Sequence, residues 1–134
     1  MGEKVGRMVG REIVFLDTHA VVWLYQRKKV FGEKSLQLMN DSDLRISPII
    51  RLELMMLFRK GRIDNPLKIL STLKRYFYFD EDQIDFGTLI TKSLLLEFTN
   101  DPFDRMIAAH AAVRKSHLIT KDREILNNSE WAVW

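Results

Sequence analysis

The fold is decided by Glu12-Ile13-Val14-Phe15-Leu16, which is followed directly by Asp17. Beyond Glu12 the residues of this stretch are β-branched, aromatic or aliphatic, so both of its faces are apolar. A strand that is apolar on both faces is typical of a parallel sheet covered by helices on each side. We therefore predict a buried parallel strand that ends at Asp17.

Segments typical of strands and helices alternate along the rest of the chain. Further strands are predicted at residues 44–46, 76–79 and 117–120, with an edge strand at 131–134. Helices are predicted around 21–24 and at 33–39, 49–60, 66–75, 84–98, 103–115 and 122–126. This alternation predicts an α/β domain with three layers, in which a parallel central sheet lies between two helical layers.

Local signals set several of the helix ends. Ser47 is predicted to be the N-cap of the helix at 49–60, because serine followed by Pro48 is a common start, and Gly61 ends that helix. Asn65 and Asp101 each precede a proline in the same way. These signals make the order of elements more certain than their lengths.

Composition limits the class of protein. The chain has 134 residues and is 46% hydrophobic, which suits one compact domain. We predict a loose leader at residues 1–10 and a single domain at 11–134. The sequence contains no cysteine, which excludes disulfides, cysteine-ligated metals and a cysteine nucleophile. Its apolar stretches are too short to span a bilayer, so we expect a cytoplasmic protein without membrane contact.

Basic residues slightly outnumber acidic ones, giving a net charge of +3. They gather at residues 27–29, 59–62, 74–75 and 114–115. These clusters either line a crevice that binds phosphates or simply favour helix C-termini and face solvent. The three histidines, His19, His110 and His117, have no metal-binding spacing, so structural or solvated roles are expected for them.

Four carboxylates follow the predicted strands or lie in helices near their ends. Asp17 and Asp122 come after strands, Asp104 lies in the first turn of a helix, and Glu53 lies within another. Because ligands of parallel α/β sheets bind at the carboxyl ends of the strands, these side chains are candidates for one site. The alternative for Asp17 and Asp122 is that each only caps the helix after it, while Asp104 favours a helix dipole.

Glu53 is harder to explain structurally, because Ile49, Ile50, Met56 and Leu57 lie one turn away from it. A carboxylate beside an apolar stripe needs a cation, hydrogen-bond donors or an exposed pocket, unless it reaches water or pairs with an arginine. Converging carboxylates repel one another unless a cation neutralises them, and oxygen ligands favour Mg²⁺ or Mn²⁺. Such a site suits phosphoryl chemistry.

Four segments, in this order, resemble the PIN domain family. They are Val14-Phe15-Leu16-Asp17-Thr18-His19, Ser47-Pro48-Ile49-Ile50-Arg51-Leu52-Glu53-Leu54, Asp101-Pro102-Phe103-Asp104-Arg105-Met106-Ile107-Ala108-Ala109-His110-Ala111 and Leu118-Ile119-Thr120-Lys121-Asp122. The third segment is the most specific, since it resembles one branch of the VapC-like toxins. The likeness runs from about residue 13 to the C-terminus and implies a three-layer α/β/α PIN-like domain.

The resemblance also implies the site and its function. Its catalytic and metal-binding residues would be Asp17, Glu53, Asp104 and Asp122. Asp101 would lie at the rim or behind the ligands, and Thr120 would orient the substrate or a bound water, unless it is an ordinary strand residue. The implied activity is that of an Mg²⁺- or Mn²⁺-dependent endoribonuclease, in which metal-activated water cleaves RNA phosphodiesters.

The same resemblance implies the partners. They would be the RNA substrate, a cognate antitoxin of a type II toxin–antitoxin pair, and a second copy of the chain in a homodimer. An alternative on the same fold is a catalytically inactive RNA-binding or interaction module. A third possibility is an enzyme that acts on DNA or a phosphomonoester through the same carboxylates.

Overall fold

A computed structural model of the protein describes residues 11–134, so the leader predicted at residues 1–10 lies outside the described residues. The strands are β1 (Glu12–Leu16), β2 (Ser42–Ile46), β3 (Phe79–Glu81), β4 (Leu118–Ile119) and β5 (Ala132–Val133). The helices are α1 (Thr18–Tyr25), α2 (Glu33–Asp41), α3 (Ile49–Arg59), α4 (Pro66–Tyr76), α5 (Phe86–Leu94), α6 (Pro102–Arg114) and α7 (Arg123–Asn128).

The five strands form one parallel sheet in the order β3-β2-β1-β4-β5. β1 lies at the centre, with Val14 beside Leu44 of β2 and Leu16 beside Ile119 of β4. The chain steps outward from β1 to β2 and β3, and then returns to place β4 on the other side of β1. The order of strands therefore switches direction between β1 and β4, which is where α/β sheets commonly bind their ligands.

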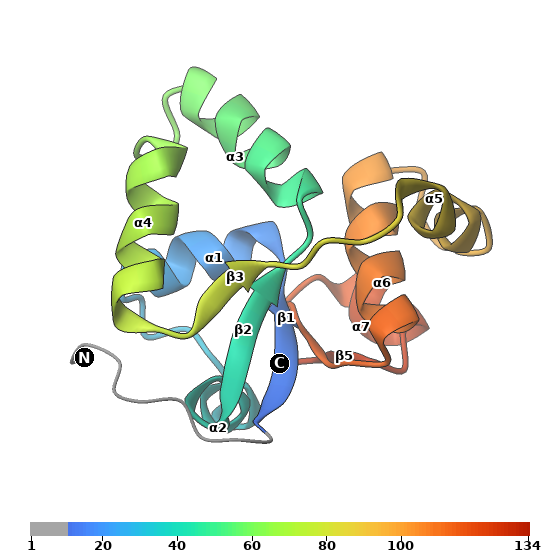
Figure 1. Cartoon of the computed structure of the whole chain (residues 1–134), viewed down its shortest axis with the longest axis horizontal. Coiled ribbons are helices and arrows are strands. Elements are labelled where there is room, and N and C mark those ends of the chain that lie inside the picture. The colour runs from blue at the N-terminus through green and yellow to red at the C-terminus, as the bar shows by residue number, and fades with distance from the viewer. Residues whose placement is uncertain (1–10) are drawn as a thin grey trace.

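Helices cover both faces of the sheet, which confirms the predicted three-layer α/β/α arrangement. In Figure 1, α1, α3 and α4 lie together on one side of the sheet, and these three helices contact one another. α5, α6 and α7 lie on the other side, where α5 packs against α6. α2 contacts β1 and β2 near the start of the sheet. Crossovers on both faces explain why the central strand is apolar throughout.

The core follows from this layering. Val14, Leu16, Leu44 and Leu118 are completely buried in the sheet, and Ile50 packs into the same core from α3. Strand β1 thus anchors the whole domain. Its burial also holds the residue that follows it, Asp17, in a fixed place at the end of β1.

Two predicted elements have different bounds in the structure. The strand expected at 76–79 begins only at Phe79, because Tyr76 completes α4 and the backbone N–H of Phe77 still donates to Leu73. The helix expected at 84–98 is shorter, since Asp85 caps α5 and the helix ends at Leu94. Hydrophobic residues continue after Leu94 because Leu96 and Phe98 pack against the core outside a regular helix. The hydrophobic run therefore does not report helix length, since Leu96 and Phe98 pack on the core while Leu94 and Leu95 are exposed.

The predicted N-cap role of Ser47 is wrong. Pro48 occupies the N-cap position of α3, and α3 has no side-chain cap. The Ser47 hydroxyl is buried without a hydrogen-bond partner among the described residues, while its carbonyl accepts the N–H of Ile50 at 3.0 Å. The predicted caps Asn65 and Asp101 do accept backbone N–H groups at the starts of α4 and α6.

Candidate functional site

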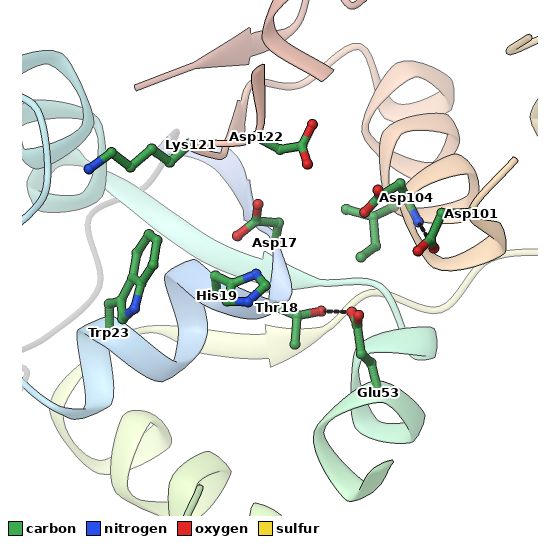
Figure 2. A pocket seen from close by; sticks show the side chains of 10 residues that line it. Asp17, Thr18, His19, Trp23, Glu53, Asp101, Asp104, Lys121 and Asp122 are labelled. Atoms are coloured by element: carbon green, nitrogen blue, oxygen red, sulfur yellow. Dashed lines mark hydrogen bonds between the residues drawn. The ribbon is translucent and has the colours of Figure 1, made fainter. Parts of the chain in front are cut away.

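A pocket of about 470 Å³ opens at the switch between β1 and β4. It is lined by Asp17, Thr18, His19, Trp23, Glu53, Asp101, Asp104, Ile107, Lys121 and Asp122. Figure 2 shows Asp17 in the middle of these side chains, with Asp104 and Asp101 on one side and Trp23 and Lys121 on the other. All four carboxylates expected at the site therefore come together, although they are far apart in the sequence.

Asp17 is the most firmly held of these carboxylates. It follows β1, is 7% exposed, and accepts the backbone N–H of Ala20 at 2.8 Å, so it does cap α1. Its other oxygen accepts the hydroxyl of Thr120. Burial raises the pKa of Asp17, against the lowering effect of those two hydrogen bonds. Capping and a place in the pocket are thus compatible roles for the same side chain.

Thr120 connects the ends of β1 and β4. Its side chain is completely buried, its hydroxyl donates to Asp17, and its oxygen accepts the backbone N–H of Asp122 at 3.1 Å. Thr120 does not line the pocket. The geometry therefore gives Thr120 the task of orienting a carboxylate, which differs from the expected contact with substrate or water.

Asp122 also lines the pocket, in the segment that follows β4. Its carboxylate accepts the N–H of Ile125 at 3.0 Å and so caps α7. The cap uses one of its two oxygens, and the residue as a whole is exposed. As with Asp17, the capping role explains the local structure without excluding a second role in the pocket.

Glu53 enters the pocket from α3. It is partly buried and accepts a hydrogen bond from the hydroxyl of Thr18, which is itself 2% exposed. The sequence indicated that this carboxylate needed a donor, a cation or an exposed pocket, and the structure supplies a donor and a pocket. Thr18 was not singled out from the sequence, although its position directly after Asp17 was a usable signal.

Asp104 lies in the first turn of α6, one turn from the cap residue Asp101. Asp101 is exposed at the rim and accepts the N–H groups of Phe103 and Asp104 at 2.8 and 3.1 Å. Burial first, and then the charges of Asp101, Asp122, Glu53 and Asp17, together raise the pKa of Asp104 to about 7. Asp104 is thus the carboxylate at which the negative field of the pocket is concentrated.

The chemistry of the donors fits a hard divalent cation. Carboxylate oxygens are the preferred ligands of Mg²⁺ and Mn²⁺, and the neighbouring carboxylates add to the effect of burial in raising the pKa of Asp104. Within residues 11–134, however, no three acidic or histidine side chains are already grouped as the ligands of one ion. The four carboxylates share the pocket wall without forming a ready-made ligand set for one ion.

Positive groups near the pocket differ from those expected. None of the basic clusters at 27–29, 59–62, 74–75 and 114–115 lines it. Lys121 and His19 do line it, together with the aromatic ring of Trp23. Neither Lys121 nor Trp23 was predicted at the site: Trp23 was expected in the core or an interface, and Lys121 lies between Thr120 and Asp122 in a segment that resembles the PIN family.

The fold and the pocket together define a class: a parallel α/β domain with a carboxylate-lined site at its topological switch point. The model of the PIN domain family matches residues 14–130, which is most of the chain. The protein therefore belongs to the PIN domain family.

Solved structures share this fold at low sequence identity. A toxin–antitoxin complex from Klebsiella pneumoniae is similar with a TM-score of 0.63 and 18% identity, over 90% of this chain and 96% of that chain. VapBC2 from Rickettsia felis, bound to a DNA fragment from the promoter, gives 0.62 and 16%, over 87% and 92%. A protein from Pyrobaculum aerophilum gives 0.59 and 18%, over 91% and 88%. At these identities the likeness shows the fold.

None of the curated protein sequences matches this chain significantly. Among the described residues, no helix is both long and apolar enough to cross a membrane.

Proposed function

We propose that the protein is a divalent-metal-dependent endoribonuclease and the toxin of a type II toxin–antitoxin pair. The observation that carries the proposal is the convergence of Asp17, Glu53, Asp104 and Asp122 on one open pocket with unbalanced negative charge. Membership of the PIN domain family and the likeness to toxin–antitoxin structures support it. Neither the family match nor the likeness of the fold depends on the geometry of the pocket, so both are independent of that observation.

Asp17, Glu53, Asp104 and Asp122 would hold the Mg²⁺ or Mn²⁺ ion. When bound, such an ion polarises a phosphate, activates a water molecule as the nucleophile and neutralises the leaving oxygen. A phosphodiester is itself negative, so the bare carboxylates would repel it. Neutralising the pocket is therefore a condition for substrate binding as well as for chemistry.

The residues of the chain prepare the site in different ways. Asp17 is fixed by Ala20 and Thr120, and Glu53 is oriented by Thr18, so both carboxylates are held before any ligand arrives. Asp104 projects from the first turn of a helix whose middle, from Ile107 to Ala111, is buried. Such preorganisation lowers the cost of assembling the site.

The proposed partners follow from the same reading. The substrate is RNA, and the antitoxin is a protein that binds this domain, as the similar complexes combine a toxin with an antitoxin. We also propose a homodimer and a cytoplasmic location, where both RNA and an antitoxin would be met.

The test is cleavage of a panel of structured and single-stranded RNAs, with single-stranded DNA beside them, in Mg²⁺, in Mn²⁺ and in chelator. Wild type and Asp104→Asn are compared, with Asp85→Asn as a matched control, because Asp85 caps α5 away from the pocket and asparagine is an equally good cap. We expect RNA cleavage by wild type and control in metal alone, with a loss of about 100-fold or more in Asp104→Asn.

Cleavage that survives chelator, or a fully active and folded Asp104→Asn protein, would contradict the proposed site. Binding of RNA without cleavage by any variant would favour the inactive binding module. Cleavage of DNA in preference to RNA would keep the metal site and change the substrate.

A further inference from the structure

We propose that His19, Trp23 and Lys121 form a subsite that stacks one unpaired nucleobase of the substrate beside the carboxylates. We call these three residues the stacking subsite. The inference rests on the proposed function, because it assumes that a single-stranded nucleic acid enters the pocket. It goes beyond that function by naming which part of the substrate is bound, and by which side chains.

The first observation is the placement of two rings on one face of α1. His19 and Trp23 are one helical turn apart, so their side chains are neighbours, and their ring centroids are 5.6 Å apart. Both line the pocket. His19 is exposed and Trp23 is partly exposed, so the two rings are not simply part of the core. An open aromatic wall next to Asp17 has ring surface available for a ligand.

The second observation is that the Trp23 ring is held from behind by other aromatic side chains. Trp134 packs edge-on against Trp23 at 5.8 Å, and Phe31 packs against Trp134 at 5.1 Å. Gly32 lies so close to Trp134 that a Cβ atom there would be 2.8 Å from its backbone, so glycine permits this contact. The ring is therefore preorganised, which reduces the entropy cost of binding a flat ligand.

The third observation is a cation beside the rings. Lys121 is exposed, lines the pocket, and holds its Nζ 5.7 Å from the centre of the Trp134 ring. Figure 2 shows Lys121 and Trp23 on the side of Asp17 away from Asp104 and Asp101. The pocket thus has two halves, one lined by carboxylates and one by rings and an ammonium group.

These halves suit two parts of a nucleotide chain. Unpaired bases stack on aromatic side chains without strict sequence preference, and lysine neutralises backbone phosphate. The carboxylate half would repel the backbone, so the stacking subsite supplies attraction that does not depend on the metal. A base in a duplex is covered by its neighbours, so the subsite should favour single-stranded RNA.

The experiment measures binding of a short fluorescent single-stranded RNA, and of the same oligomer with abasic sugars, to proteins carrying Asp104→Asn to prevent cleavage. In this background we compare Trp23→Leu with Trp131→Leu. Trp131 is a matched control, because it is also partly buried, packs on His117 at 6.3 Å and does not line the pocket. Trp23→Phe keeps an aromatic face and serves as the conservative variant.

We expect Trp23→Leu to weaken binding about tenfold, Trp23→Phe to restore most of it, and Trp131→Leu to leave it unchanged. Abasic RNA should bind the protein that retains Trp23 as weakly as intact RNA binds the Trp23→Leu variant. Lys121→Gln should reduce the slope of log affinity against log salt by about one.

Equal binding of intact and abasic RNA by proteins with Trp23 would overturn the inference, as would unchanged binding in a folded Trp23→Leu protein. If Trp23→Leu does not fold, the abasic comparison and Trp23→Phe still decide. Cleavage of RNA with no dependence on Trp23 would remove the stacking subsite alone. Trp23-dependent binding, together with no cleavage by the protein that retains Asp104, would instead remove the proposed nuclease activity and keep the subsite.

Discussion

Helix α6 contributes to two sites that each contain a carboxylate removed from water. The two sites differ in whether basic side chains pair with that carboxylate. At its first turn, Asp104 faces the carboxylate pocket, while about two and three turns later His110 and Arg114 contact Asp82, the residue after β3. We call Asp82, His110, Arg114 and Arg45 the Asp82 cluster. Both places bring a carboxylate away from water, yet only the Asp82 cluster provides positive partners from the chain itself.

The Asp82 cluster is balanced. Asp82 accepts from His110 Nε2 at 2.8 Å and from Arg114 Nε at 2.6 Å, and Arg45 lies at 3.5 Å. Burial pushes the pKa of Asp82 upward, but the hydrogen bonds from His110 and Arg114 outweigh it, so the pKa is lowered overall. His110 is completely buried, and burial lowers its pKa. The Asp82 cluster therefore needs no ligand to balance its carboxylate, which suits a structural role.

The carboxylate pocket is not balanced. Within the described part of the chain, no cation forms an ion pair with Asp104, and burial together with the surrounding carboxylates raises its pKa to about 7. A protein gains no stability from carboxylates arranged in this way. The comparison indicates that the Asp82 cluster stabilises the fold, whereas we propose that the carboxylate pocket binds a ligand that supplies positive charge.

The largest expected difference between the two regions is in stability. Asp82→Ala leaves His110 and Arg114 without their acceptor, so we expect the free energy of unfolding to fall by about 3 kcal/mol and the melting temperature by roughly 10 °C. Asp104→Ala in chelator should melt at or above the wild-type temperature. Thermal melts followed by circular dichroism check both variants, and an equal loss in the two would refute the contrast.

A smaller effect should appear in the pH dependence of the metal-free protein. Between its ordinary value of 3.8 and about 7, native Asp104 holds a proton that the unfolded chain has lost, so stability should fall as pH rises through this window. Asp82 acts oppositely, since its lowered pKa gives stability that is lost when pH falls below 3.8.

Asp104→Asn should therefore make the free energy of unfolding depend less on pH near neutrality. It should also raise that free energy in mildly alkaline buffer that contains chelator. We expect a gain of about 1 kcal/mol, because solvent screens a half-buried group. Denaturant titrations at a series of pH values measure it. An unchanged slope would show that Asp104 does not experience the field of its neighbours.

The smallest of these effects concerns the orientation of Asp17. Thr120→Val keeps the shape of the buried side chain but removes the donor to Asp17. We therefore expect the free energy of unfolding to fall by about 1 kcal/mol and Mn²⁺ binding to weaken. Thr120→Ser keeps the hydroxyl and should retain metal affinity. If the valine variant binds Mn²⁺ as wild type does, the hydrogen bond to Asp17 has no part in preparing the site.

Much of the fold could be predicted because local signals agreed with it. The apolar stretch before Asp17 indicated a central parallel strand, and Asn65 and Asp101 marked helix starts that the structure retains. Predictions failed where tertiary contacts decide the outcome. Leu96 continues a hydrophobic run without continuing α5, and Ser47 is buried at a helix start without capping it.

The candidate site could be predicted in its acids but not in its partners. Asp17 and Asp122 could be placed together because the carboxyl ends of parallel strands share one edge of the sheet. The donors Thr18 and Thr120 depend on side-chain directions across elements that sequence spacing does not give. Asp82 was not predicted from the sequence, since its three hydrogen-bonding partners come from β2 and α6 and meet only in the folded chain.

The most direct test of the central claim is calorimetric titration of Mn²⁺ into metal-free wild type, Asp104→Asn and Asp85→Asn. Because none of the four carboxylates of the pocket forms an ion pair within the described residues, we predict saturable binding to wild type and Asp85→Asn, and a loss of about 10- to 100-fold in affinity in Asp104→Asn. Equal Mn²⁺ binding by all three folded proteins, or no binding by wild type, would contradict the account.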